Sequence, residues 1–198
     1  MKNNSNTFEP IEEMNVRLAK KRAGIINSVY AHFVLSNIPV LKTVPYVIAG
    51  GCLASELQGD VPRDIDLFFL NLSDRINIPT HLELVKNNDL QYHDDSLISS
   101  HVIRYNGLIV DERLKYPPSM DINVILTKFK TWKELIDNFD MLHCKTVYDP
   151  GKDAFFISKK AYNAVVDKKI VNAKNVPLKS FRVQKFIDRG YTIENVSV

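Results

Sequence analysis

The sequence predicts an α+β protein in which helices flank a small mixed β-sheet. Short β-branched and apolar runs bounded by glycine, proline or asparagine indicate strands, and apolar residues at three- and four-residue spacings indicate amphipathic helices. The two kinds of element are interspersed at uneven intervals and no segment repeats. Such an arrangement is typical of a fold built around one sheet.

Length and composition set further bounds. The 198 residues, 45% hydrophobic and 25% charged, match one ordinary globular domain of roughly 100–200 residues. We expect a flexible arm over residues 1–12 and a single domain over 13–198 with a helical C-terminal part. A net charge of +3 permits an anionic ligand but does not indicate a dedicated nucleic-acid coat.

The sequence shows no mark of a membrane or secreted protein. It contains no run of about 18 apolar residues, and its polar, acidic start is unlike a signal peptide. Cys52 and Cys144 are the only cysteines, too few for a disulfide framework. We therefore expect a soluble protein of the cytoplasm, that of the host cell if the source is viral, with no membrane partner.

The first predicted element is a helix over residues 14–35. Arg17, Lys20 and Lys21 lie on one of its faces, which is either solvated or a contact for phosphate or nucleic acid. The apolar residues that recur at helical spacing and form a buried stripe are Val16, Ala19, Ala23, Ile26, Val29, Tyr30 and Phe33.

A strand, a helix and a second strand are predicted next. Residues 46–49 are nearly all apolar, as in a central strand, and lead directly into Gly50 and Gly51. Residues 52–57 predict a short helix. Residues 64–70 alternate charge and bulk before becoming wholly apolar, which predicts a strand.

Further elements follow in the second half of the chain. A helix is predicted over residues 80–87, and a hairpin over 100–110 because Asn106-Gly107 is a strong turn dipeptide. β-branched residues predict a strand over 120–126. The remaining predicted helices cover residues 131–138, 158–167 and 177–189.

The residues that indicate chemistry are Asp64 and Asp66, which follow the two glycines after twelve intervening residues. Side chains alternate along a strand, so both carboxylates point to one face while Ile65 and Leu67 point into the core. Two neighbouring carboxylates repel each other and need a cation, and oxygen ligands suit Mg²⁺ or Mn²⁺. Two such ions about 3.5–4 Å apart can hold the attacking and leaving oxygens of a phosphoryl transfer.

Asp121 supplies a third carboxylate, flanked by apolar residues on a later predicted strand. If that strand neighbours the one carrying Asp64, the three acidic side chains converge. Asp121 then ligates one metal ion and takes the proton from an attacking hydroxyl.

Gly50 and Gly51 indicate where phosphate binds. Two glycines between a strand and a helix let the backbone approach a phosphate closely, and the N–H groups at a helix start favour anions. Cys52 or Ser55 adds a contact there. Arg63 either reaches a triphosphate or is a surface charge at the start of a strand.

Basic residues also recur near the C-terminus. Arg182, Lys185 and Arg189 follow at three- and four-residue steps, so they share a face of the predicted helix. That face is either solvated or a contact for a triphosphate or nucleic acid. The apolar residues of this region predicted to lie in the core are Leu178, Phe181 and Phe186.

These motifs resemble a known signature. Ile48-Ala49-Gly50-Gly51, the spacing to Asp64-Ile65-Asp66-Leu67 and the later Met120-Asp121-Ile122 are similar to the DNA polymerase β-like nucleotidyltransferase superfamily, which includes CCA-adding enzymes and poly(A) polymerases. The resemblance implies a nucleotidyltransferase-like mixed sheet and transfer of a nucleoside monophosphate (NMP) from an NTP, with two Mg²⁺ ions and release of pyrophosphate.

The resemblance also implies roles for single residues. Asp64 and Asp66 hold both ions, Asp121 holds the catalytic ion and acts as or assists the base, and Gly50 and Gly51 cradle the β- and γ-phosphates. Ser55, Arg63, Arg182 and Lys185 complete the nucleotide-binding set.

A second likeness extends over the C-terminal part. Its motifs are similar to nucleotidyltransferase-like proteins of large viruses and phages. The chain departs from CCA-adding enzymes in lacking the long helical body with which they select bases and hold tRNA. The residues that carry this likeness are Phe139-Asp140, Cys144, Tyr148-Asp149, Arg182, Lys185 and Arg189-Gly190-Tyr191.

Functions of different classes remain open on the sequence. An enzyme moves an NMP from an NTP onto a hydroxyl of a protein, an RNA end or a small molecule. A catalytically silent module of the same fold binds a nucleotide or a partner through the same site. A nucleic-acid-binding protein uses the basic helix faces, with an affinity that falls steeply with salt.

Overall fold

Residues 13–71, 91–95, 100–108, 120–174 and 176–194 are described in the computed structural model of the chain. The predicted arm over residues 1–12 and the predicted helix over residues 80–87 lie outside these ranges.

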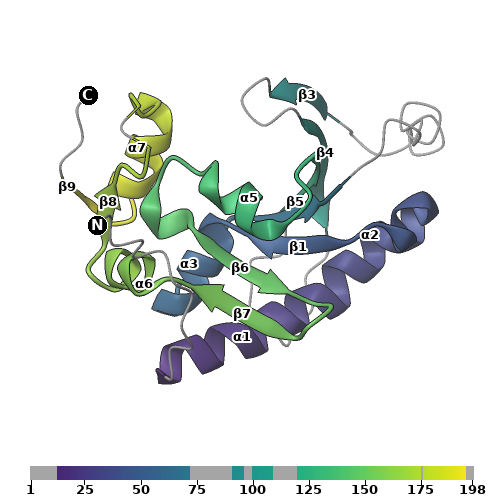
Figure 1. The fold of residues 1–198 in the computed structure, drawn as a ribbon, viewed down its shortest axis with the longest axis horizontal. Coiled ribbons are helices and arrows are strands. Elements are labelled where there is room, and N and C mark those ends of the chain that lie inside the picture. Colours follow the sequence, from purple (N-terminus) through teal and green to yellow (C-terminus); the bar gives the residue numbers. More distant parts are fainter. Residues whose placement is uncertain (1–12, 72–90, 96–99, 109–119, 175, 195–198) are drawn as a thin grey trace, which may run out of the picture.

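A seven-stranded mixed sheet forms the centre of the molecule (Figure 1), in the order β3-β4-β5-β2-β1-β6-β7. β2 and β5 pair in parallel, and the other neighbours pair antiparallel. The mixed sheet flanked by helices is therefore confirmed. The strands are β1 (Tyr46–Ala49), β2 (Asp64–Phe69), β3 (Gln91–Asp95), β4 (Ser100–Leu108), β5 (Met120–Leu126), β6 (Thr146–Asp149) and β7 (Ala154–Ile157).

The predicted N-terminal helix covers one face of the sheet (Figure 1). It consists of α1 (Met14–Ile26), a π-helical turn η1 (Asn27–Ala31) and α2 (His32–Asn37), and a 3-10 turn η2 (Pro39–Thr43) follows it. Its apolar stripe packs on the strands, where Ile65 and Leu67 are fully buried. The hydroxyl of Tyr46 in β1 donates to Asn27 Oδ1 at 2.7 Å, which ties the π-helical turn to the sheet.

Helix α5 (Trp132–Asp137) lies on the opposite face. The Thr131 side chain caps it by accepting from the Glu134 amide, the interaction expected of a threonine at this position. Trp132 packs against Val47 and Phe68 in the core of this face. Phe68 shares its side of β2 with Asp64 and Asp66, so this face is apolar at one end and acidic at the other.

Two more helices join α1 near the end of β1. α3 (Gly51–Gln58) and α6 (Lys159–Val166) bury Ala54, Leu57 and Ala161 against Ala19. The carboxylate of Glu56 is fully buried and lies 3.1 Å from Arg22 Nη1, which fixes α3 against α1.

The C-terminal segment is a small layer of its own. It contains the 3-10 turn η5 (Leu142–Cys144), the parallel strands β8 (Lys169–Val171) and β9 (Thr192–Glu194), and α7 (Ser180–Ile187). Phe186 and Leu178 are buried in it, as predicted. Phe181 is 68% exposed, so its predicted place in the core is wrong. α7 is shorter than the predicted helix because Lys179 is still extended, and Gly190, with a φ of 81°, turns the chain beyond it.

The predicted hairpin over residues 100–110 is also wrong. β4 runs without a turn from residue 100 to 108 and pairs with β5 along its length. Asn106 and Gly107 instead lie where the pairing register shifts, between Tyr105 and Leu108. An Asn-Gly pair within a strand thus produces a bulge rather than a reversal.

Among the described residues, none of the helices combines the length and apolar character that crossing a membrane requires.

Candidate active site

The pairing of β2 with β5 decides where the three predicted carboxylates lie. The two strands are parallel and in register, with Asp64 opposite Asp121 and Asp66 opposite Asn123. Neighbouring strands are about 4.8 Å apart, and opposite residues point to the same face. Because Ile65 and Leu67 are buried on the other face, Asp64, Asp66 and Asp121 all lie on the face that carries α5.

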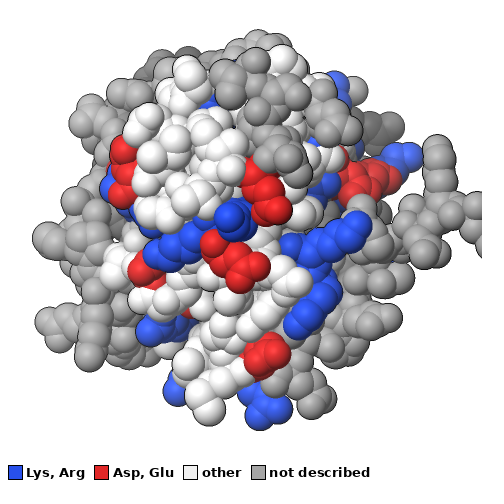
Figure 2. All heavy atoms as spheres, turned by 90° about the vertical axis from the view of Figure 1, so that its left-hand side faces the viewer, with Lys and Arg blue, Asp and Glu red and all other residues white. Residues whose placement is uncertain are grey.

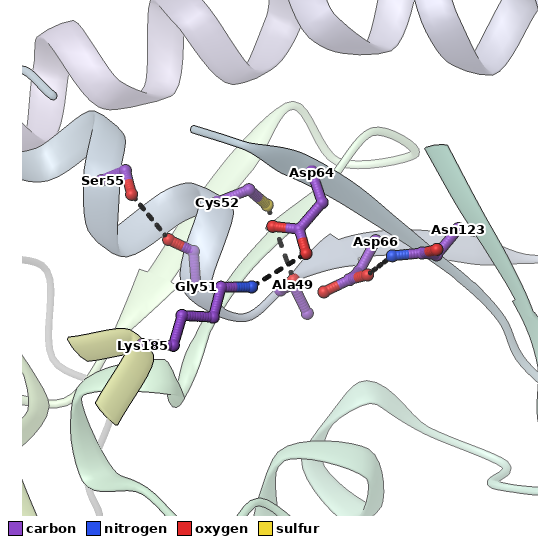
Figure 3. A network of polar contacts seen from close by, with 8 residues as sticks. All are labelled: Ala49, Gly51, Cys52, Ser55, Asp64, Asp66, Asn123 and Lys185. Atoms are coloured by element: carbon purple, nitrogen blue, oxygen red, sulfur yellow. Dashed lines mark hydrogen bonds and ion pairs between the residues drawn. The ribbon is translucent and has the colours of Figure 1, made fainter. Parts of the chain in front are cut away.

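Asn123 is a member of the site that the sequence analysis missed. Its Nδ2 donates a hydrogen bond of 2.7 Å to Asp66 Oδ1 (Figure 3). The signal was present, since Asn123 stands two residues after Asp121 and therefore on the same face of the strand. The contact fixes one oxygen of Asp66 and leaves the other toward the Gly50 turn.

Asp66 is the most perturbed carboxyl of the site. Burial and the negative charge of Asp64 raise the pKa of Asp66 to about 6, although the hydrogen bond from Asn123 and the charge of Lys185 oppose this rise. Burial is the larger of the two causes, so the shift reflects mainly the removal of this carboxylate from water.

Lys185 brings a positive charge to these acids from the far end of the sequence. Its Nζ lies 3.0 Å from Asp64 Oδ2 (Figure 3). One helical turn earlier, Arg182 Nη1 lies 2.6 Å from Asp140 Oδ2. Arg189 lies beyond the end of α7 and shares neither contact. Two of the three predicted basic residues thus form ion pairs within the chain.

The Gly50 turn lies directly beside the carboxylates. Gly50 has φ 93° and ψ −151°, a conformation that essentially only glycine adopts, and a Cβ there would lie 3.7 Å from Asp66 Oδ2. Thr146 in β6 holds the turn twice: its carbonyl accepts from the Gly50 amide at 3.1 Å, and its hydroxyl donates to the Gly50 carbonyl at 3.0 Å. Within the part of the chain that the structure describes, no side chain caps the N-terminus of α3, which follows the turn.

Cys52 and Ser55 are engaged within α3 and its surroundings. Cys52 is buried, its Sγ lies 3.6 Å from the carbonyl of Ala49, and burial raises the pKa of the thiol well above its usual value. The Ser55 hydroxyl donates to the carbonyl of Gly51 at 3.1 Å and lies on the far side of Gly51 from Asp66 (Figure 3). Cys52 is therefore a packed thiol and not an activated nucleophile.

The structure separates the predicted nucleotide-binding residues. Gly50 and Lys185 adjoin the carboxylates, and Gly51 follows Gly50 in the chain. Arg182 is paired with Asp140, and Ser55 and Arg63 line a pocket that the three carboxylates do not line. The sequence spacing could not separate these groups, because Arg63 directly precedes Asp64.

The donor atoms on the acidic face are of the chemical type that binds a divalent cation, although these described residues are not gathered into a metal site. Three carboxylates and the Asn123 amide are the oxygen-rich set that Mg²⁺ and Mn²⁺ prefer. Within the described ranges, no three acidic, histidine or cysteine side chains are gathered closely enough to form a metal centre. Lys185 is paired with Asp64 Oδ2, so a metal ion at that oxygen requires this contact to be exchanged. Asn123 is bonded to Asp66 Oδ1 and leaves Oδ2 available.

The predicted basic faces do not form one continuous positive surface. On the side of the molecule that carries α7, basic and acidic side chains are interleaved (Figure 2). On α1, Lys20 lies 2.9 Å from Asp153 Oδ2, while Arg17 and Lys21 are exposed.

A family model described as Gad2, Gabija anti-defense 2 family protein, matches residues 20–168. The chain belongs to this family. The Gad2 match includes the Gly50 turn and all three carboxylates and ends before α7, which carries Lys185. A comparison with curated proteins finds no match.

Solved structures of CCA-adding enzymes are also similar to this Gad2 family member. The enzyme of Thermotoga maritima in complex with tRNA has 14% identity and a TM-score of 0.47, with 94% of this chain and 41% of that chain covered. The enzyme of Bacillus stearothermophilus in complex with CTP has 12% identity and a TM-score of 0.46, with 92% and 42% covered. The chain thus spans about two fifths of the length of these proteins.

Proposed function

We propose that the chain is a metal-dependent nucleotidyltransferase that moves an NMP from an NTP onto a hydroxyl and releases pyrophosphate. The observation that carries the proposal is the in-register parallel pairing of β2 with β5, which places Asp64, Asp66 and Asp121 on one face. The Gly50 turn and the start of α3 support it. The Gly50 N–H donates to Thr146, but the glycine lets a phosphate approach the first N–H groups of α3 beside the acids.

Each residue then has a role in the transfer. Asp64, Asp66 and Asp121 hold two Mg²⁺ or Mn²⁺ ions, which when bound supply charge stabilisation for the attacking and leaving oxygens. Gly50 and Gly51 hold the β- and γ-phosphates. Asp121 accepts the proton of the acceptor hydroxyl, and the oxygen of that hydroxyl bonds to the α-phosphorus. The bond from the α-phosphorus to the oxygen that bridges it to the β-phosphorus breaks, and pyrophosphate leaves.

Lys185 changes partner during this cycle. Its ammonium group neutralises Asp64 in the structure. With Asp64 holding a divalent cation instead, the ammonium group of Lys185 would be available to contact the triphosphate, the role predicted for it. Asn123 keeps Asp66 oriented throughout, because its amide already donates to the carboxylate.

The family description suggests the setting of the reaction. Gad2 proteins are named for action against Gabija defense. We propose that the acceptor hydroxyl belongs to a protein, an RNA end or a small molecule on which that defense depends. Nucleotidylation of such a group adds bulk and a negative charge and so blocks its use.

The test is a transfer assay with each of the four α-labelled NTPs, Mg²⁺ and purified Gabija defense proteins, with total RNA and a small-molecule extract in parallel. Labelled product in one fraction, with equimolar pyrophosphate, identifies the acceptor class. Asp66→Asn is expected to abolish labelling, and Asp137→Asn, the same change at an exposed carboxylate on α5, to leave it unchanged. Equal labelling by the Asp66 variant and the parent would refute the site assignment.

A second candidate function is a silent module that binds a nucleotide or a partner. The ion pair of Lys185 with Asp64 and the hydrogen bond from Asn123 to Asp66 favour it, because they satisfy both acids without a metal ion. NTP binding by calorimetry with no pyrophosphate released in the presence of any acceptor fraction would support this candidate over the enzyme.

A further inference from the structure

A pocket of about 180 Å³ lies between the C-terminal half of α3 and the turn that follows α7. Ser55 and Gln58 from α3, Arg63 from the start of β2, and Arg189 and Tyr191 from the C-terminal segment line it. Its volume is about six times the roughly 30 Å³ that one water molecule takes up in the liquid. The three carboxylates of the candidate active site do not line it, so the pocket is a separate feature.

Positive charge dominates the walls of this pocket. Arg63 and Arg189 both line it, and within the described part of the chain neither guanidinium takes part in an ion pair. Asp60 is the acid among the lining residues, and its carboxylate lies 3.7 Å from Lys168 Nζ. Because Lys168 offsets Asp60, two guanidinium groups remain to face a ligand.

Arg189 is held in place from several sides. Its guanidinium carbon lies 5.6 Å from the centroid of the buried Phe186 ring, and its carbonyl lies 3.4 Å from Lys168 Nζ. Its Nη2 is buried, and among the described residues it has no hydrogen-bond partner. A buried donor without an acceptor is unfavourable, so an anionic oxygen that gives the guanidinium an acceptor is bound with a gain in free energy.

Two of the other polar side chains that line the pocket, those of Ser55 and Gln58, already donate elsewhere. The Ser55 hydroxyl donates to the Gly51 carbonyl, and Gln58 Nε2 donates to the carbonyl of Val165. Recognition therefore depends on the two arginines, whose planar donor pairs match the oxygens of a phosphate group.

We propose that this pocket is a phosphate-binding subsite separate from the carboxylates. Arg63, which lines the pocket, directly precedes Asp64 of the candidate active site. Either substrate of that site, the NTP or the acceptor, therefore supplies the phosphate. The binding itself does not require that the chain transfers nucleotides, so the proposal and the proposed function fail independently.

The test is isothermal titration calorimetry of the full chain with inorganic phosphate, in EDTA so that no metal ion bridges phosphate to the carboxylates. Arg63→Ala and Arg189→Ala are each expected to weaken phosphate binding about tenfold or more. Arg17→Ala, which removes the same charge from an exposed position on α1, is expected to change it less than twofold. Arg189→Lys, which keeps the charge but loses the planar donor pair, is expected to fall in between.

Phosphate affinity in Arg63→Ala and Arg189→Ala equal to that of Arg17→Ala would overturn the proposal. A titration with a non-hydrolysable ATP analogue separates the two sources. If Arg189→Ala weakens binding of the analogue as much as that of phosphate, the pocket holds the NTP, and if it weakens phosphate binding alone, the pocket holds the acceptor. Either result supports the subsite.

Discussion

The central strands and the C-terminal helix α7 deliver charged residues to the same place by different means. Asp64 and Asp121 are neighbours because backbone hydrogen bonds fix the register of β2 against β5. Lys185 reaches Asp64 across 121 residues of sequence because Phe186 next to it is buried in the C-terminal core. The backbone hydrogen bonds between β2 and β5 fix the positions of the acidic side chains. The packing of α7 fixes Lys185 through only a few side-chain contacts, which can be exchanged.

The largest expected effect is on catalysis, and it compares a substitution on the central strand β5 with one on α7. Asp121→Asn removes the proposed base and is expected to lower kcat for NMP transfer by on the order of 10²–10⁴-fold. Lys185→Gln is expected to act mainly on KM for the NTP, since its partly exposed ion pair with Asp64 contributes on the order of 1 kcal/mol. Steady-state kinetics on both variants checks this, and a larger loss of kcat in the lysine variant would reverse the comparison.

The next prediction concerns how α7 is docked. Phe186 is 5% exposed, and its ring centroid lies 4.2 Å from that of His143. Phe186→Ala is expected to reduce the free energy of unfolding by about 3–5 kcal/mol. Phe181→Ala, at the exposed position on the same helix, is expected to change it by less than about 0.5 kcal/mol. Urea denaturation measures both, and equal losses would mean that α7 is not held through Phe186.

A smaller effect is expected at the turn beside the carboxylates. Gly50→Ala forces a side chain into a conformation with φ 93° and is expected to cost about 1–3 kcal/mol. That loss lowers Tm by about 2–4 °C per kcal/mol in a chain of this size. Gly51→Ala places a Cβ 3.6 Å from Phe186, an ordinary contact, and is expected to be neutral or stabilising by up to about 1 kcal/mol. Equal melting temperatures of the two variants would contradict the conclusion that the backbone conformation at residue 50 requires glycine.

The last prediction is a pH dependence of the C-terminal layer. Burial, followed by the charge of Arg182, lowers the pKa of His143 to about 3. The folded state therefore keeps the imidazole neutral, while the unfolded chain binds a proton below about pH 6.5. This group thus destabilises the fold as the pH falls from about 6.5 toward 3, by up to about 1.4 kcal/mol per pH unit.

A comparison with His143→Leu isolates that contribution. Between pH 7 and pH 5, the parent is expected to lose up to about 2 kcal/mol more than the variant. Asp66 acts with the opposite sign, because its pKa of about 6 in the folded state lies above its unfolded value, but it does so in both proteins. Parallel stability curves for parent and variant would show that His143 does not titrate on unfolding.

The sequence predicted the central strands well because the pattern of neighbouring residues along each strand decides which of its faces is buried. The alternation of Asp64 and Asp66 with Ile65 and Leu67 decides which side of β2 is buried, and the structure agrees. It also identified Asp121 as the acid of a neighbouring strand. The roles of these residues in metal binding and catalysis stay predictions.

What the sequence could not predict depends on contacts between distant segments. The spacing of Arg182 and Lys185 indicates a shared face but not their partners, Asp140 and Asp64. Phe181 and Phe186 are equally apolar, and only the docking of α7 determines which one is exposed. Asn106-Gly107 has the local preference of a turn, which the pairing of β4 with β5 overrides.

The two hydrogen bonds between Thr146 and Gly50 have a consequence for biosynthesis. The glycine bend is encoded early in the chain, yet the strand that sets its shape is translated almost a hundred residues later. A nascent polypeptide on the ribosome therefore exposes an unformed loop at this point until β6 has emerged. Shortened products that stop before residue 146 carry Asp64, Asp66 and Asp121 but have no threonine to shape the bend beside them.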